Sequence, residues 1–277
     1  MQSNWPEGRP PQSPAEILPP EGRTVDYDRD PGQPRARSRG SENTRWASAP
    51  ATYTLVGINC AVYVAMVVRG VSATSPSVYD LVHWGANFGG AVLGGQWWRL
   101  LTAAFVHVGI LHLATNMWCL WNLGLLGEPL LGPAGMVAVY VLTGIAGNLL
   151  SVAVHPQIVG AGASGAVFGI AGVLIMLLKA KLLPVPPEEV RRLRKSVIYF
   201  AFLNFLIGGT SLFLRTSIQI DNMAHLGGFC CGLIVGAPMV PRIGAARSQF
   251  AVRSWAAYGG MSVLLLVFAF GIASFWR

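Results

Sequence analysis

Charged residues are scarce in this chain. They make up 12% of its 277 residues, whereas hydrophobic residues make up 53%. Soluble globular domains contain about 25% charged residues. The shortage indicates that lipid rather than water is the main solvent around the chain.

Long stretches of the sequence contain no Asp, Glu, Lys or Arg. A membrane-spanning helix needs roughly 20 consecutive apolar residues, and the run 129–178 is long enough for two spans. The charge-free runs therefore predict seven spans, at about 51–69, 103–124, 133–153, 164–180, 197–214, 222–240 and 255–275.

The first 45 residues lack apolar runs, and they also lack the apolar core of a signal peptide. A segment of this kind buries too little surface to offset its ordering entropy. We therefore expect residues 1–45 to form a disordered cytoplasmic tail. Residues 46–240 are expected to hold six transmembrane helices, and residues 241–277 a linker and a seventh.

Basic residues exceed acidic ones by 20 to 12, and they gather on the loops of one membrane side. Cytoplasmic loops collect Lys and Arg, so the N-terminus is predicted to be cytoplasmic and the C-terminus extracytoplasmic. Topology accounts for the charge, and no basic face with aromatic residues indicates a nucleic-acid partner. The few lysines, three of the 20 basic residues, are typical of a GC-rich bacterial genome.

Polar residues inside spans are costly and are therefore functional candidates. The first is Ser164, between Ala163 and Gly165 at the start of the fourth predicted span. Small neighbours leave its hydroxyl accessible, and a helix N-terminus favours developing negative charge. The alternative is a serine that only caps the helix, beside glycines that serve close packing.

The second candidate is His225 in the sixth predicted span, since histidine is suited to accepting a proton near neutral pH. Gly228, Gly232 and Gly236 form a small-residue stripe that predicts close contact with another helix. If that helix is the fourth span, His225 meets Ser164. The alternative is a histidine bonded only to a backbone carbonyl.

The third candidate is the series His107, His112 and Asn116 at the start of the second predicted span. His112 and Asn116 share one helix face and can both donate hydrogen bonds, as an oxyanion hole requires. A zinc site is the weaker alternative, because the spacing is not HExxH and the span contains no acid.

Taken in order, these residues resemble the rhomboid family of intramembrane proteases. The resemblance covers about residues 50–240 and rests on six segments: QWWRLLTAAFVH, HLATNMWCLWNLG, GEPLLGPAG, YVLTGIAGN, GASGAVFGIAG and NMAHLGGFCCGLIVG. It implies an all-α membrane protein, a six-span rhomboid-like helical bundle plus one extra C-terminal transmembrane helix.

The resemblance also implies roles for these residues. Ser164 would attack the scissile carbonyl and His225 would accept its proton, without a third catalytic acid. Asn116, His112 and the Ser164 N–H would form the oxyanion hole. Phe168 would pack against the catalytic histidine.

Further positions follow from the same resemblance. Gly162 and Gly228 support the site, and Trp98 and Arg99 lie in a mainly structural first loop, about 70–100, that embeds partly in the outer leaflet. The fifth span and the loop before it would gate substrate entry. The expected partners are transmembrane-helix protein substrates and membrane lipids, with no nucleic acid, and no cofactor or metal is expected.

Asp221, four residues before His225, is the acid that a catalytic triad would use. We predict that it is not one, because it lies at the membrane boundary, where its charge can stay hydrated and complement the helix N-terminus.

Two other classes of protein compete with the protease. A non-catalytic rhomboid-like protein that binds client helices would share the fold but should lack Ser164 or His225, and both are present. A transporter would show two related halves and broken midplane helices, which this sequence does not have.

Overall fold

The computed structural model describes residues 49–179, 188, 190–199, 202, 221–240 and 247–276. The predicted tail, 1–45, most of the predicted fifth span, 197–214, and linker residues 241–246 lie outside the described residues.

Within the described residues, four helical segments are long and apolar enough to cross a membrane. They are Pro50–Val68 (α1), Ile110–Val154 (α5), Asn222–Met239 and Ser248–Phe275. The third comprises α8, Asn222–Gly236, and the 3-10 turn η2, Ala237–Met239, and the fourth lies within α9, Arg247–Phe275. The apolar helix α6, Ser164–Leu177, is shorter.

Helix α5 contains two of the predicted spans. Its 45 residues are interrupted at Gly132, whose φ of 74° lies in the left-handed region that favours glycine, and Pro133 follows. The prediction of a span from residue 103 was wrong by seven residues, because α5 begins at Ile110. Residues 103–109 form an apolar loop, which charge-free sequence cannot distinguish from helix.

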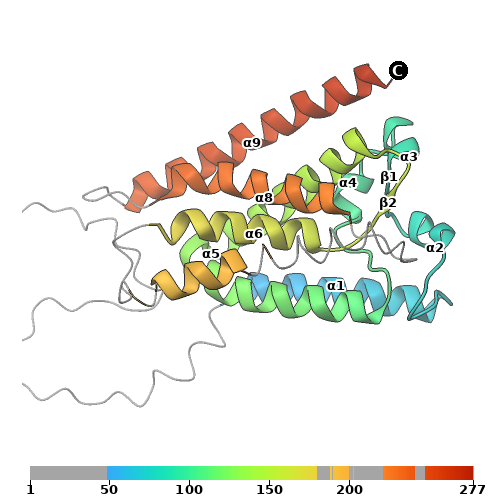
Figure 1. The fold of residues 1–277 in the computed structure, drawn as a ribbon, viewed down its shortest axis with the longest axis horizontal. Helices are drawn as coiled ribbons and strands as arrows, with labels where there is room; N and C mark the ends of the chain where they lie inside the picture. The colour runs from blue at the N-terminus through green and yellow to red at the C-terminus, as the bar shows by residue number, and fades with distance from the viewer. Residues whose placement is uncertain are drawn as a thin grey trace, which may run out of the picture.

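Helix α6 lies at the centre of the bundle, between α5 and α8, while α1 packs against α5 (Figure 1). Twelve of the 14 residues of α6 are buried. Helix α9 runs along the outside and diverges from α8 toward its C-terminus (Figure 1). It begins at Arg247 rather than at the predicted residue 255.

The contact between α6 and α8 is close because glycines line it. A Cβ added at Gly232 would lie 2.0 Å from the carbonyl oxygen of Gly169, and one at Gly228 would lie 2.0 Å from that of Gly165. Small residues at such positions let helix backbones approach one another in membranes. The predicted glycine stripe of the sixth span therefore faces the fourth span.

The first loop is folded rather than extended. It contains three short helices and a strand that pairs antiparallel with β2, Val159–Gly160. The loop elements are α2, Val78–His83; β1, Asn87–Phe88; α3, Gly89–Leu93; and α4, Arg99–Thr102. The two-stranded sheet is an addition to the predicted all-α fold.

Arg99 is the residue that closes this loop. Its guanidinium is buried, donates to the carbonyl oxygens of Val82 and Ala86 at 2.6 and 3.1 Å, and lies 4.5 Å from the ring centre of Trp98. All of these contacts lie within the first loop.

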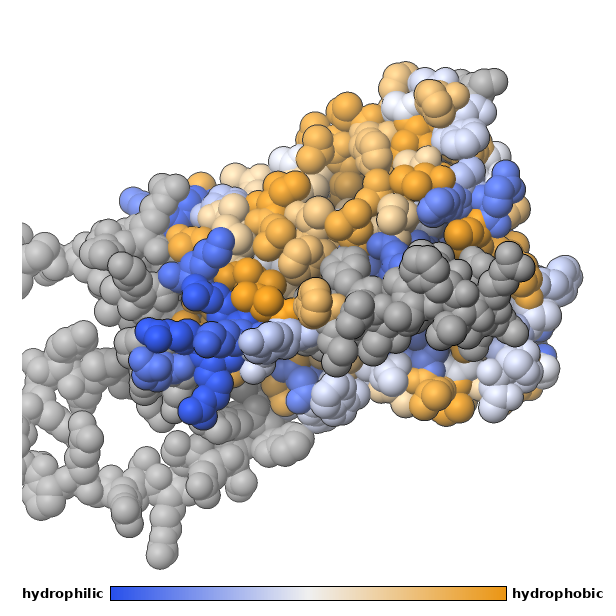
Figure 2. All heavy atoms as spheres, in the orientation of Figure 1, coloured by the Kyte–Doolittle hydropathy of each residue, from blue (hydrophilic) through white to orange (hydrophobic). Residues whose placement is uncertain are grey.

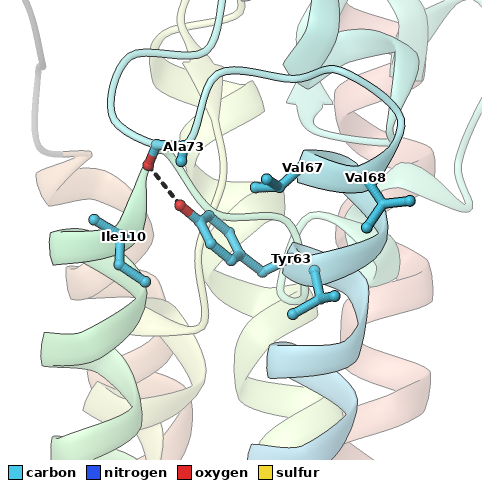
Figure 3. Close-up of a pocket in the computed structure, with 6 residues that line it drawn as sticks. Tyr63, Val67, Val68, Ala73 and Ile110 are labelled. Carbon is cyan, nitrogen blue, oxygen red and sulfur yellow. Dashed lines mark hydrogen bonds between the residues drawn. The ribbon is translucent and has the colours of Figure 1, made fainter.

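Beside the first loop, the C-terminal end of α1 carries an apolar pocket (Figure 3). Val67 and Ile110 line it, and the Tyr63 hydroxyl donates to the Ala73 carbonyl at its edge. On the face shown in Figure 2, hydrophobic residues cover much of the surface between the left and right ends, and hydrophilic residues gather toward those two ends. This distribution suits a protein that crosses a membrane.

Candidate active site

The first turns of α6 and α8 bring Ser164 and His225 together. Ser164 is the first residue of α6 and is half-buried, while His225 is buried in the first turn of α8. The Nε2 atom of His225 lies 2.9 Å from the Oγ atom of Ser164. This distance is within the range for hydrogen bonding and proton transfer.

The His225 ring is held by an aromatic side chain from α6. Phe168, one turn after Ser164, stacks on it with ring centres 4.4 Å apart and ring planes 19° apart. Phe168 and Ser164 lie on the same face of α6 because they are four residues apart. One helix therefore supplies both the hydroxyl and the surface on which the imidazole rests.

Gly162 shapes the segment that leads into Ser164. Its φ of 135° is a conformation that other residues rarely adopt, and its N–H donates to the Ala103 carbonyl oxygen at 2.9 Å. A Cβ at this position would lie 2.6 Å from the Cε1 atom of His112. Glycine is therefore required both for the backbone conformation and for the close approach of the His112 ring.

His112 can donate a hydrogen bond through its Nε2 atom. Its Nδ1 atom accepts from the Val108 N–H at 3.4 Å, which leaves the proton of a neutral ring on Nε2. A Cβ at Gly162 would lie 3.0 Å from this Nε2 atom. The donor is therefore close to Gly162, which precedes Ser164 by two residues.

Asn116 is buried one turn further along α5. One N–H of its amide donates to the His112 carbonyl oxygen at 2.9 Å. An amide nitrogen has two N–H groups, so a second one can serve another acceptor. The backbone N–H groups of the first turn of α6, beginning with Ser164, have no partner within that helix.

His107 has a part that sequence reasoning did not assign. It precedes α5 and is fully buried, with Nδ1 3.3 Å from the Phe105 carbonyl oxygen. Its Nε2 atom accepts from the Ala163 N–H at 3.4 Å, directly beside Ser164. Burial, and secondly the nearby His112, lower the pKa of His107 to about 3, so the ring is neutral and can accept.

The spacing of His107 gave no signal for this contact, because its partner is a backbone group 56 residues away. Among the described residues, no group of three or more His, Cys, Asp or Glu side chains could hold a metal ion. The His107–His112 pair, with ring centres 5.3 Å apart, is thus a contact of two rings rather than part of a larger ligand cluster.

Comparison with known proteins places this architecture in a family. Residues 94–242 match the rhomboid domain model, and this region includes every residue of the site described above. The chain therefore belongs to the rhomboid family.

Named relatives agree with this assignment. The chain is 31% identical over 197 residues to rhomboid protease GluP of Bacillus subtilis, covering 70% of this chain and 36% of that protein. It is 31% identical over 204 residues to rhomboid protease AarA of Providencia stuartii, covering 66% of this chain and 70% of that protein. RHOMBOID-like protein 7 of Arabidopsis thaliana is 32% identical over 162 residues, which cover 58% of this chain and 49% of the relative. The match with GluP and the plant protein spans about a third to a half of their length.

Proposed function

We propose that this protein is an intramembrane serine endopeptidase in which Ser164 is the nucleophile and His225 the general base. The observation that carries the proposal is the 2.9 Å contact between Ser164 Oγ and His225 Nε2 inside an apolar bundle. A serine hydroxyl is a weak nucleophile unless an adjacent base accepts its proton. The names of GluP and AarA as rhomboid proteases support the same activity.

In the proposed reaction, Ser164 Oγ attacks the scissile carbonyl carbon while its proton passes to His225 Nε2. The tetrahedral intermediate carries an oxyanion, which backbone and side-chain donors stabilise. The Ser164 N–H at the start of α6, the His112 Nε2–H and the free N–H of Asn116 are the proposed donors. His225 then gives the proton to the leaving amine, and water hydrolyses the acyl enzyme in a second cycle.

The proposed substrates are single-span transmembrane proteins, cut near the outer membrane face. Ser164 and His225 lie in the first turns of α6 and α8, which begin at the same end of the bundle as the first loop. That end is the outer one if the basic loops are cytoplasmic. A site near the end of the bundle is within reach of water, which hydrolysis consumes.

The test is covalent trapping of the nucleophile. The full-length protein, purified in detergent, is treated with a fluorophosphonate, and the labelled residue is mapped by mass spectrometry. We expect a single adduct on Ser164, loss of the adduct in His225→Ala, and cleavage of a reporter transmembrane substrate that Ser164→Ala abolishes.

Two results would reject the proposal. One is substantial cleavage by purified, folded Ser164→Ala. The other is a folded wild-type protein that neither takes the label nor cleaves any transmembrane reporter, which would favour the rival, a non-catalytic protein that binds client helices.

A further inference from the structure

Asp221 joins three elements at the end of the bundle where His225 lies. It is the N-cap of α8, and its Oδ1 atom accepts from the Ala224 N–H at 2.9 Å. Its Oδ2 atom accepts a hydrogen bond from the hydroxyl of Ser151 near the C-terminal end of α5. A Cβ added at Gly160 in β2 would lie 3.0 Å from the same oxygen.

We propose that Asp221 is a positioning residue, which fixes the start of α8 against α5 and so holds His225 within reach of Ser164. This proposal rests on the proposed protease function. The backbone N–H of His225 donates to the Asp221 carbonyl oxygen at 3.2 Å, so the histidine belongs to the turn that Asp221 caps. Helix ends fray when their free N–H groups lose a cap.

The His225 ring is therefore held from two directions. Phe168 of α6 stacks on the face of the ring. Asp221 binds Ser151 of α5 and so anchors the helical turn that contains His225. Ser151 is buried, at 1% exposed, so its hydroxyl needs an internal partner, and the carboxylate provides one. Removing the carboxylate would leave the first turn of α8 without its cap and the buried Ser151 hydroxyl without its acceptor.

This role differs from that of a triad acid. Both carboxylate oxygens of Asp221 are engaged by groups other than the imidazole, namely the Ala224 N–H and the Ser151 hydroxyl. Asparagine can serve the same two partners, because its oxygen accepts from an N–H and its NH₂ group can donate to a serine oxygen. A triad acid, in contrast, loses about 10⁴-fold in turnover when it becomes asparagine.

The experiment compares Asp221→Asn, Asp221→Ala and Ser151→Ala with the wild type, using one reporter transmembrane substrate. We expect Asp221→Asn to stay within about threefold of wild-type kcat. Asp221→Ala should lose about 10- to 100-fold in kcat with little change in KM, as for a misplaced reacting group. Ser151→Ala should fall between the two.

The matched control is Ser77→Ala. Ser77 is the N-cap of α2 in the first loop, where its hydroxyl accepts from the Asp80 N–H. This variant also loses a helix cap, but not one attached to His225, so its kcat should remain near the wild-type value. Thermal unfolding identifies a temperature at which every variant is folded, and all rates are measured there.

Hydrogen–deuterium exchange tests the positioning without relying on activity. Asp221→Ala should speed exchange of the Ala224 and His225 amides at least tenfold, while Ser77→Ala should leave them unchanged. Unchanged exchange in Asp221→Ala would overturn the inference even if the wild type proved inactive, an outcome that would by itself reject only the proposed function.

The kinetic results can overturn the inference independently. Wild-type kcat in Asp221→Ala would show that His225 does not depend on this residue. Equal losses of about 10⁴-fold in Asp221→Asn and Asp221→Ala would instead make Asp221 a triad acid.

Discussion

Gly228→Ala should separate Ser164 from His225 without changing either residue. Gly228 lies on α8, one turn after His225, and faces the backbone of Gly165, the neighbour of Ser164. The added methyl carbon would lie 2.0 Å from the Gly165 carbonyl oxygen and 2.8 Å from its carbonyl carbon. The obstacle is backbone, which cannot rotate away as a flexible side chain can.

The size of the effect follows from this distance. Real Cβ atoms essentially never approach within 3.0 Å of another heavy atom in such a contact, so α6 and α8 must move apart by about 1 Å at this level. The distance between Ser164 Oγ and His225 Nε2 would then increase from 2.9 Å to about 4 Å. Since a 1 Å misplacement of reacting groups can cost about 100-fold in rate, we expect kcat to fall by that factor.

The assay is turnover of a reporter transmembrane substrate by purified protein, together with thermal unfolding. Gly259→Ala is the matched control, because Gly259 lies on α9 and an added Cβ would meet no other element within 4 Å among the described residues. Gly232→Ala makes an equally short contact, 2.0 Å from the Gly169 carbonyl oxygen, but lies one turn further from His225. It should lower the unfolding temperature as much as Gly228→Ala and lower kcat less.

Gly228→Ala with kcat within threefold of wild type would refute this reasoning. So would an equal loss in Gly259→Ala, since that substitution adds the same methyl group at a position where the described residues leave space for it.

Four further substitutions distinguish residues expected to act in catalysis from residues expected to stabilise the fold. His225→Ala should lower kcat as much as Ser164→Ala, with the double variant little worse, because groups that act as a unit are non-additive; multiplied losses in the double variant would contradict this. Asn116→Ala should lower kcat by about 100- to 1,000-fold, as for one lost oxyanion donor, and unchanged turnover would remove it from the site. His107→Ala should lower both the unfolding temperature and kcat, since it leaves the N–H next to the nucleophile buried without an acceptor, at about 1–3 kcal/mol; a normal unfolding temperature would argue against that bond. Glu128→Ala should lower only the unfolding temperature, because the carboxylate accepts hydrogen bonds from two N–H groups and a hydroxyl in the first turn of α1, and Glu128 lies about three helical turns along α5 from Asn116; a specific loss of kcat would show that it acts on catalysis.

The sequence predicted the helices because their signals are local. Charge-free runs of sufficient length located α1 and both halves of α5, and the four-residue spacing from Gly228 to Gly236 indicated which face of α8 meets a neighbour. The same spacing did not identify the partner helix: it would bring His225 to Ser164 only if the neighbour was the fourth span, and the structure has α6 in that place.

The remaining features depend on contacts that no local pattern encodes. Glu128 accepts a hydrogen bond from the N–H of Ala51, which lies 77 residues away in the sequence. No local pattern in the sequence indicates that these two residues pair. The start of α5 was misplaced because loop residues 103–109 are as apolar as a span, and the two-stranded sheet was missed because each strand has only two residues. His107 illustrates the same difficulty, since it binds a backbone N–H rather than a side chain.

The proposed mechanism uses no third catalytic acid, and the cost of burying a carboxylate offers a physical reason for this. An ionised carboxylate in an apolar surround is costly unless it is paired and hydrogen-bonded. Stacking on Phe168 orients the His225 ring with an apolar contact that carries no such cost. The carboxylate nearest in sequence, Asp221, lies instead where α8 begins, and its oxygens there satisfy a helix N-terminus and the Ser151 hydroxyl. The proposed serine–histidine pair is held by glycine contacts, a stacked ring and a capped helix end. This arrangement avoids the free-energy cost of burying a carboxylate beside the imidazole.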